Sequence, residues 1–325
     1  MLTFCKRTAQ TLRGCQYVPD SEKGHYESYF LRANHPEKAQ GFWIRYTLFS
    51  PRGRPDKALG EIWAVFFDGE SDRMTAVQEE FPLSQCAFSA ERMAAQVGNN
   101  TLESGRLRGS SQRGSDRMDW DLTYGGEEPP ILLLPEALYH TRLPKAKALV
   151  TAPNVQFDGL VRVNGTDYVI NAWQGSENHN WGSKHTDEYA WGQVAGFDNA
   201  PAAFLECSTA RLKLGPVWSP WLTVAVVRWE GRTWHFNNLL LAVKAKARYR
   251  QGDWQFETAN QHARLTVRFG APASHFVSLT YKNPPGGACI CLNSKIAACE
   301  ITLEEKGGAS HYFRTRQRAA FEMLS

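Results

Sequence analysis

The sequence has few cysteines and no long apolar run. Its 7 cysteines among 325 residues are irregularly spaced, and an odd number leaves at least one thiol unpaired in any disulfide scheme. The scarcity of cysteine argues against a disulfide-stapled secreted domain and favours a reducing, cytoplasmic location. The longest apolar runs, such as 131–134 and 239–243, fall far short of the ~20 residues that a membrane-spanning helix needs. We therefore expect a soluble protein without a transmembrane segment or a secretory signal.

The chain also has little excess charge of either sign. Lys and Arg number 37 against 33 Asp and Glu, which gives a net charge of +4. This imbalance is too small to predict a nucleic-acid partner. Two basic runs, 244–250 and 314–318, could touch anionic lipid headgroups, so peripheral membrane contact stays open.

Common cofactor and catalytic motifs are missing. The sequence has no G-x-G-x-x-G, no Walker A, no H-E-x-x-H, no G-x-S-x-G and no paired C-x-x-C motif. Cys289 and Cys291, with Cys299, do not complete a set of four zinc ligands. We therefore expect neither a cofactor nor a metal ion.

What dominates instead is alternation of apolar and polar residues with a period of two. Segments with this pattern are rich in aromatic and β-branched residues, which predicts β-strands. Helical patterns are limited to 89–97 and to a C-terminal helix at 315–324, and the stretch 105–116 is expected to be an exposed loop. The predicted strands cover 41–49, 59–67, 120–124, 155–163, 167–173, 202–208, 221–229, 233–244, 254–258, 264–269, 275–281 and 298–303.

So many short strands without alternating helices predict an all-β protein of antiparallel barrels or sandwiches. Prolines flank a short segment between two strand-rich halves, at 144–153. This composition predicts one domain at 1–145 and a second at 150–325.

The segment 171–192 concentrates the residues that could carry chemistry. It holds two His, three Trp, two Glu and one Asp. The bulky tryptophans must be buried or must line a cavity, and a cavity would make this segment a site. Alternatively, the tryptophans plug a barrel and His179 bonds buried carbonyl groups. His179 and His185, with Glu177 or Asp187, could in principle hold a metal, but no regular helix places both histidines on one face.

Within this segment the sequence resembles a known family. It is similar to the carotenoid 1,2-hydratase (hydroxyneurosporene synthase) and AttH-like group of two-domain lipocalin-related proteins, over nearly the whole chain. The residues that carry the resemblance are His179-Asn-Trp-Gly182, His185, Tyr189-Ala-Trp-Gly192 and Phe204-Leu-Glu206, supported by 26–32, the strands of Trp43 and Trp63, 105–109 and 120–122.

The resemblance implies two tandem lipocalin-like (calycin) antiparallel β-barrels, the second of which carries the His-Asn-Trp-Gly motif. It also implies a cavity, in or between the barrels, for a hydrophobic molecule such as a terpenoid or polyene. Relatives of this group include hydratases, tocopherol cyclase-like enzymes and pericyclase-like enzymes.

Hydration or cyclisation of an alkene needs a general acid, exclusion of bulk water and aromatic faces that stabilise a developing cation. Burial raises the pKa of a carboxylic acid and would keep it protonated. Asp187 and Glu188 are two carboxylates near the motifs, in addition to the candidates named below. Arg45 could bind a substrate carbonyl or carboxylate, or pair with a glutamate at 27 or 61. The catalytic candidates are His179, Glu177, Glu27 and Glu206; the candidates for substrate binding are Trp173, Trp181, His185, Tyr189, Trp191, Tyr29, Trp43, Arg45 and Trp63.

Two functions therefore fit the sequence. The first is a cofactor-independent hydratase, cyclase or isomerase that uses acid catalysis on a hydrophobic terpenoid or polyene. The second is a lipocalin-like carrier that binds such a molecule without changing it. The sequence leaves the substrate, the identity of the acid and the oligomeric state open.

Overall fold

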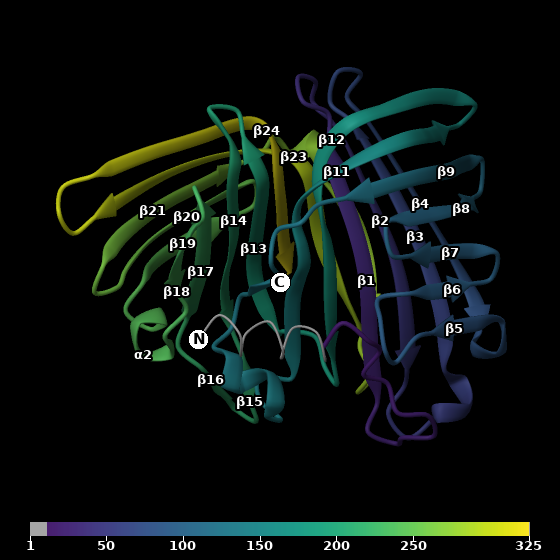
Figure 1. The fold of residues 1–325 in the computed structure, drawn as a ribbon. Helices are drawn as coiled ribbons and strands as arrows, with labels where there is room; N and C mark the ends of the chain where they lie inside the picture. The colour runs from purple at the N-terminus through teal and green to yellow at the C-terminus, as the bar shows by residue number, and fades with distance from the viewer. Residues whose placement is uncertain (1–11, 325) are drawn as a thin grey trace.

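The computed structural model describes residues 12–324, apart from the side chain of Leu214, and consists mainly of two large antiparallel sheets that lie side by side (Figure 1). Within that range the helical elements are short, and none is long and apolar enough to cross a membrane. They are α2 (Leu239–Ala242) and the 3-10 turns Pro55–Lys57, Leu83–Gln85, Glu136–His140 and Ala273–His275.

The first sheet curls into a nearly closed barrel. Its strand order is β4-β3-β2-β1-β12-β11-β9-β8-β7-β6-β5, with β10 paired to β11, and β4 contacts β8 and β9 across the opening. Its strands are β1 (His25–Asn34), β2 (Gln40–Ser50), β3 (Leu59–Asp68), β4 (Arg73–Pro82), β5 (Cys86–Phe88), β6 (Ala95–Val97), β7 (Asn100–Glu103), β8 (Arg106–Arg113), β9 (Asp116–Gly125), β10 (Ile131–Leu132), β11 (Ala146–Val163) and β12 (Thr166–Gly182).

The second sheet is strongly curved and has the order β18-β17-β14-β13-β24-β23-β21-β20-β19, with β22 paired to β23. A separate ribbon pairs β15 (Lys213–Leu214) with β16 (Val217–Trp218). The strands of the second sheet are β13 (Glu188–Phe197), β14 (Ala200–Arg211), β17 (Leu222–Trp229), β18 (Arg232–Phe236), β19 (Lys246–Arg250), β20 (Asp253–Ala259), β21 (Ala263–Gly270), β22 (Val277–Lys282), β23 (Ala288–Glu305) and β24 (Ser310–Leu324).

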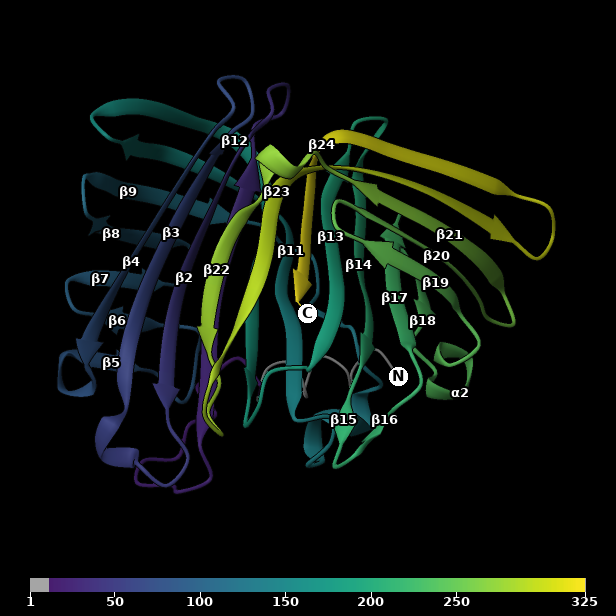
Figure 2. The ribbon, with the colours of Figure 1, turned by 180° about the vertical axis from the view of Figure 1, so that it is seen from behind.

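The all-β antiparallel architecture predicted from period-two alternation is confirmed. Alternate residues of β1, such as Tyr29, Leu31 and Ala33, fill the core of the first barrel. Nevertheless β1, β2 and β3 are buried along nearly their whole length. The reason is that their outer faces pack on the second sheet, where Trp43 and Val65 share a cluster with residues of β22 and β23. Figure 2 shows β22 and β23 beside β2 and β3 from behind.

Four local predictions were wrong. Residues 315–324 form no helix but lie in β24, because pairing with β13 and β23 overrides the helix propensity of this segment. Residues 89–97 form bends that lead into β6. The expected loop at 105–116 is mostly β8, whose side chains are largely exposed and polar because they lie on the barrel exterior. The strand predicted at 233–244 ends at Phe236, before α2.

The chain passes from the first sheet to the second between Gly182 and Glu188. Residues 146–182 therefore complete the first sheet, and the His-Asn-Trp-Gly motif lies on β12 of that sheet, not on the second. The division into domains at residues 145 and 150 stays a prediction.

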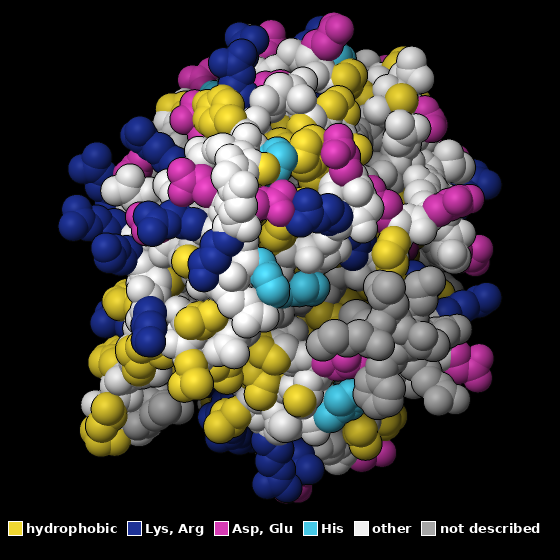
Figure 3. Space-filling view, turned by 60° about the vertical axis from the view of Figure 1, so that its left-hand side comes forward, with side chains coloured by type: hydrophobic (Ala, Val, Ile, Leu, Met, Phe, Trp, Pro, Cys, Tyr) yellow, Lys and Arg dark blue, Asp and Glu magenta, His cyan; other side chains and the backbone are white. Residues whose placement is uncertain are grey.

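Apolar side chains are exposed around α2. Leu240 is 78% exposed, and Leu239 and Val243 are also exposed. Figure 3, in which the side carrying α2 is turned toward the viewer, shows hydrophobic side chains gathered low on this face, with Lys and Arg side chains beside them.

The close approach of β1 and β12 gives a test of the fold. Gly175 pairs with Ala33, and a Cβ added to Gly175 would lie 1.8 Å from the carbonyl oxygen of Arg32. We expect Gly175→Ala to force the strands apart and to lower the free energy of unfolding by more than ~2 kcal/mol in urea denaturation. Gly125→Ala is the control, because no atom lies within 4 Å of its added Cβ; equal losses in both variants would contradict this packing.

Candidate functional site

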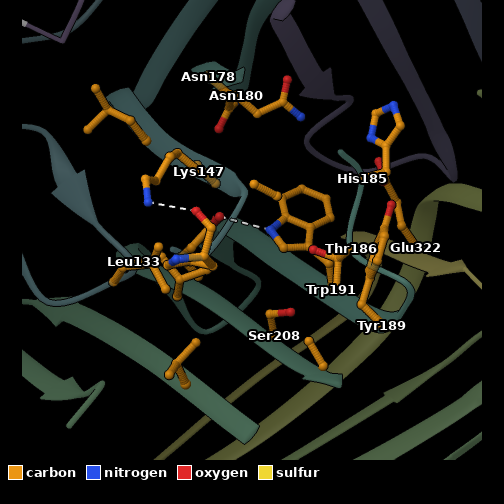
Figure 4. A pocket seen from close by; sticks show the side chains of 18 of the residues that line it. Leu133, Lys147, Asn178, Asn180, His185, Thr186, Tyr189, Trp191, Ser208 and Glu322 are labelled. Carbon is orange, nitrogen blue, oxygen red and sulfur yellow. Dashed lines mark hydrogen bonds between the residues drawn. The ribbon is translucent and has the colours of Figure 1, made fainter. Parts of the chain in front are cut away.

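A cavity of about 380 Å³ lies between the two sheets. Its walls come from β1, β2, β11 and β12 of the first sheet and from β13, β14, β17, β22 and β24 of the second. Six aromatic side chains border it: Tyr26, Phe30, Trp43, Tyr189, Trp191 and Tyr281. In Figure 4, Lys147 and His185 lie on opposite sides of this cavity, with Trp191 between them.

Glu206, on β14, is the carboxyl of this cavity best suited to hold a proton. Its Oε1 accepts a hydrogen bond from Trp191 Nε1 at 2.8 Å, and its Oε2 accepts one from Gln193 Nε2 at 2.8 Å. Burial raises the pKa of Glu206 to about 7, although these hydrogen bonds and the charge of Arg32 favour the ionised form. Both protonation states of Glu206 are therefore accessible near neutral pH, as general acid–base catalysis requires.

His185 and Arg45 lie together at the other end. The His185 ring stacks on Tyr26, with centroids 3.9 Å apart, and on Tyr281 at 5.7 Å. Burial and the positive charge of Arg45 lower the pKa of His185 to about 3, so this ring is neutral at physiological pH. The Arg45 guanidinium lies 4.6 Å from the Tyr281 ring centroid and 5.8 Å from that of Trp43.

Glu322, another residue of the cavity wall, belongs to a buried ion pair. Lys295 Nζ lies 2.7 Å from Glu322 Oε1, and Lys295 is fully buried. The ammonium also lies 5.6 Å from the ring centroid of Trp191 and 5.5 Å from that of Trp43. The Lys295 ammonium thus neutralises the charge of the Glu322 carboxylate, which borders the cavity.

Glu27 and His179 form a polar cluster on the inner face of the first barrel. His179 Nε2 lies 2.7 Å from Glu27 Oε1, and His179 Nδ1 lies 2.8 Å from the carbonyl oxygen of Leu12. The backbone N–H of Gln16 and a ring nitrogen of His25 also contact the Glu27 carboxylate. His179 borders the cavity, but both of its ring nitrogens are occupied in holding the segment 12–16 against the barrel.

The environment of Glu27 favours its ionised form. Burial raises the pKa of this carboxyl, but the hydrogen bonds from His179 and His25 outweigh burial and lower the pKa to about 2. The surroundings of these two buried glutamates therefore shift their pKa values in opposite directions, down for Glu27 and up for Glu206.

The remaining candidates divide between the two faces of the first sheet. Tyr29, Trp173 and Glu177 are on the inner face, where the Tyr124 hydroxyl donates a hydrogen bond to Glu177. Trp181 is also there, stacked on His179 at 4.4 Å. On the outer face, Trp63 packs against Tyr281 at 6.0 Å but does not border the cavity.

The structure thus gathers Trp43, Arg45, His185, Tyr189, Trp191 and Glu206 around one cavity. Across the described chain, no cluster of three His, Cys, Asp or Glu side chains is placed to hold a metal ion. Sequence reasoning missed Tyr26, Lys295 and Glu322. Lys295 and Glu322 each stand alone in an apolar stretch, which is a usable signal of a buried ion pair. The helix predicted at 315–324 hid this signal, because it assigned Glu322 to a helix face and not to one face of a strand.

Comparison with solved structures matches the fold of this chain to that of known proteins. A protein assigned as AttH from Nitrosomonas europaea superposes with a TM-score of 0.57 at 11% identity, over 96% of each chain. Kievitone hydratase from Nectria haematococca gives 0.57 at 10% identity, over 95% of this chain and 92% of its own. CghA, solved with Sch210972, gives 0.56 at 11% identity, over 97% and 95%.

This chain has the AttH-like fold. The resemblance drawn from the His-Asn-Trp-Gly motif is therefore confirmed for the fold, and a hydratase is among the proteins that share it. Two uncharacterized proteins of Mycobacterium tuberculosis (strains CDC 1551 / Oshkosh and ATCC 25618 / H37Rv) are 23% identical over 282 residues, which is 86% of this chain and 82% of theirs. No protein-family model matches the chain.

The depressed pKa of Glu27 predicts a pH-dependent loss of stability. Stability from the ionised carboxylate is fully present above the ordinary glutamate pKa of 4.5 and is lost as the pH falls toward about 2. In urea denaturation, we expect the difference in unfolding free energy between wild type and Glu27→Gln to shrink by about 3 kcal/mol over this interval. Glu103→Gln, at an exposed position, is the control. A difference that stays constant with pH would contradict the assignment of an ionised Glu27.

Proposed function

We propose that this AttH-like chain is a cofactor-independent enzyme that protonates a carbon–carbon double bond of a hydrophobic small molecule, leading to hydration, cyclisation or isomerisation. One observation carries the proposal: Glu206 is a buried carboxyl with a pKa near 7 in the wall of an aromatic cavity. Two proteins that share the fold support the proposal: kievitone hydratase, and CghA, which was solved with the small molecule Sch210972.

The contacts of Glu206 suit a proton donor. Protonated Glu206 transfers its proton to an alkene carbon, and the indole faces of Trp43 and Trp191 stabilise the resulting cation. The carboxylate that remains accepts hydrogen bonds from Trp191 and Gln193. In a hydration, water adds to the cation and returns its proton to Glu206; in an isomerisation or cyclisation, a neighbouring C–H bond of the cation returns it.

Deuterium incorporation separates this chemistry from binding alone. The ligand is first recovered by native mass spectrometry and organic extraction of the purified protein, and then incubated with the protein in D2O. We expect a deuterium atom at a non-exchangeable carbon, at a rate that falls as the pH rises through about 7. Glu206→Gln should lower this rate by at least ~100-fold.

Glu61→Gln is the matched control, because Glu61 is a buried glutamate that does not border the cavity. It should keep the wild-type rate. A ligand recovered unchanged and without deuterium would support a carrier instead, the second function that fits the sequence. A protein that is empty and shows no tryptophan quenching with any polyene would exclude both functions.

We further propose that the mouth of this cavity meets an anionic lipid surface, from which a hydrophobic substrate could enter. Leu143 and Leu239 border the cavity and are 53% and 41% exposed. The strand that follows α2 in the chain, β19, exposes Lys246, Arg248 and Arg250 on one face. Apolar side chains beside basic ones are the pattern of interfacial binding. The basic run 314–318 contributes less, because Arg318 is buried against Asp198.

Vesicle sedimentation tests this surface. Wild-type protein should sediment with phosphatidylserine-containing vesicles and be released by salt, because the attraction is screened. Reversing Lys246 and Arg248 to Glu should weaken binding by roughly tenfold or more. Arg113→Glu, an exposed position on β8, should bind as wild type does. Equal binding to neutral vesicles would contradict the proposed basic contact.

A further inference from the structure

Arg45 is a buried cation with open hydrogen-bonding capacity. It lies on β2, is only 4% exposed and borders the cavity. Its Nε donates a hydrogen bond to Ser28 Oγ at 2.8 Å. No residue of the described chain accepts a hydrogen bond from its two terminal nitrogens, and no described carboxylate pairs with it. The alternatives in which Arg45 pairs with Glu27 or Glu61 are therefore not realised, since Glu27 contacts histidines and Glu61 contacts Trp63 and Lys282.

The other buried cations of the described chain all have partners at their charged ends. Lys295 pairs with Glu322 and Arg318 with Asp198. Lys147 donates to the carbonyl oxygen of Pro144 at 2.7 Å, and Arg32 donates to acceptors on Asn34 and Gln193. Arg45 differs because its neighbours toward the cavity are aromatic rings and the neutral His185 ring.

Burying an unpaired guanidinium in such surroundings is costly, and an anionic oxygen placed in the cavity would offset that cost. A pure hydrocarbon would leave the charge unpaired. We propose that the ligand of this cavity is a hydrophobic molecule with one anionic oxygen, a carboxylate or a phenolate, which the terminal nitrogens of Arg45 bind. This inference rests on the proposed function, because it names the class of substrate for the same cavity.

The placement of Arg45 also orients such a ligand. Arg45 is on the first sheet beside His185 and Tyr281, whereas Glu206 is on β14 of the second sheet beside Trp191. A molecule anchored through its oxygen at Arg45 extends its apolar part along the aromatic wall toward Glu206. Arg45 is thus a specificity-determining residue, and Glu206 is the proton donor.

Two polyenes that differ only in their polar end test the inference. Retinoic acid carries a carboxylate and retinol a neutral hydroxyl, and quenching of tryptophan fluorescence reports both, because Trp43 and Trp191 border the cavity. At neutral pH we expect wild-type protein to bind retinoic acid roughly tenfold more tightly than retinol. Arg45→Met should remove this preference and keep the affinity for retinol. Arg45→Lys should retain part of the preference.

Lys282→Met is the control, because Lys282 pairs with Glu61 and Glu80 and does not border the cavity. It should keep the wild-type preference. Equal wild-type affinities for the two polyenes, or a preference that survives in Arg45→Met, would overturn the assignment to Arg45 and leave the proposed function standing. Failure of wild-type protein to bind either polyene would also overturn this inference, whereas the proposed function is decided by the deuterium experiment. The wild-type comparison decides even where Arg45→Met does not fold.

Discussion

The pairing of β1 with β12 is the constraint on which both the Glu27–His179 cluster and the cavity wall depend. Each strand presents alternate side chains to opposite faces of the first sheet. Glu27 and Tyr29 therefore face the barrel interior, together with His179 from β12, while Tyr26 and Phe30 face the second sheet and border the cavity. A register slip of one residue would exchange the two sets and destroy both the histidine–carboxylate cluster and the cavity wall.

Glu27 and Glu206 are both buried glutamates, and they differ in protonation because their surroundings differ. Glu27 accepts hydrogen bonds from two histidines and a backbone N–H, which favour its charged form. Glu206 has only an indole and an amide as hydrogen-bond donors, and burial of its carboxyl raises the pKa. A sequence shows neither set of neighbours. His179 lies 152 residues from Glu27, and the pairing of Gln193 with Glu206 depends on the register of the β13–β14 hairpin. The candidate acids could therefore be named from the sequence but not ranked.

Much of the fold was predictable because period-two alternation is clear in strands with one face on the core and one in solvent, such as β20 and β21. Two tight turns also follow from residue chemistry, because Asn164-Gly165 and Glu230-Gly231 join hairpin strands with positive φ at all four residues, a conformation that glycine adopts readily. The site was harder to predict. Trp173 and Trp181 face the first barrel, whereas Trp191 lies beyond the crossing at 183–187 and borders the cavity. Alternation fixes the face that a residue occupies within one strand, but it does not reveal where the chain changes sheets.

A cavity between two sheets takes its width from the way the sheets pack, not from its lining alone. Phe67, Val65 and Leu279 belong to the cluster that joins the sheets, yet none of them borders the cavity. Because packed interiors transmit changes in side-chain volume, altering these residues moves one wall relative to the other. Such an architecture can change the size of the molecules that its cavity admits during evolution while Glu206 and Arg45 stay in place.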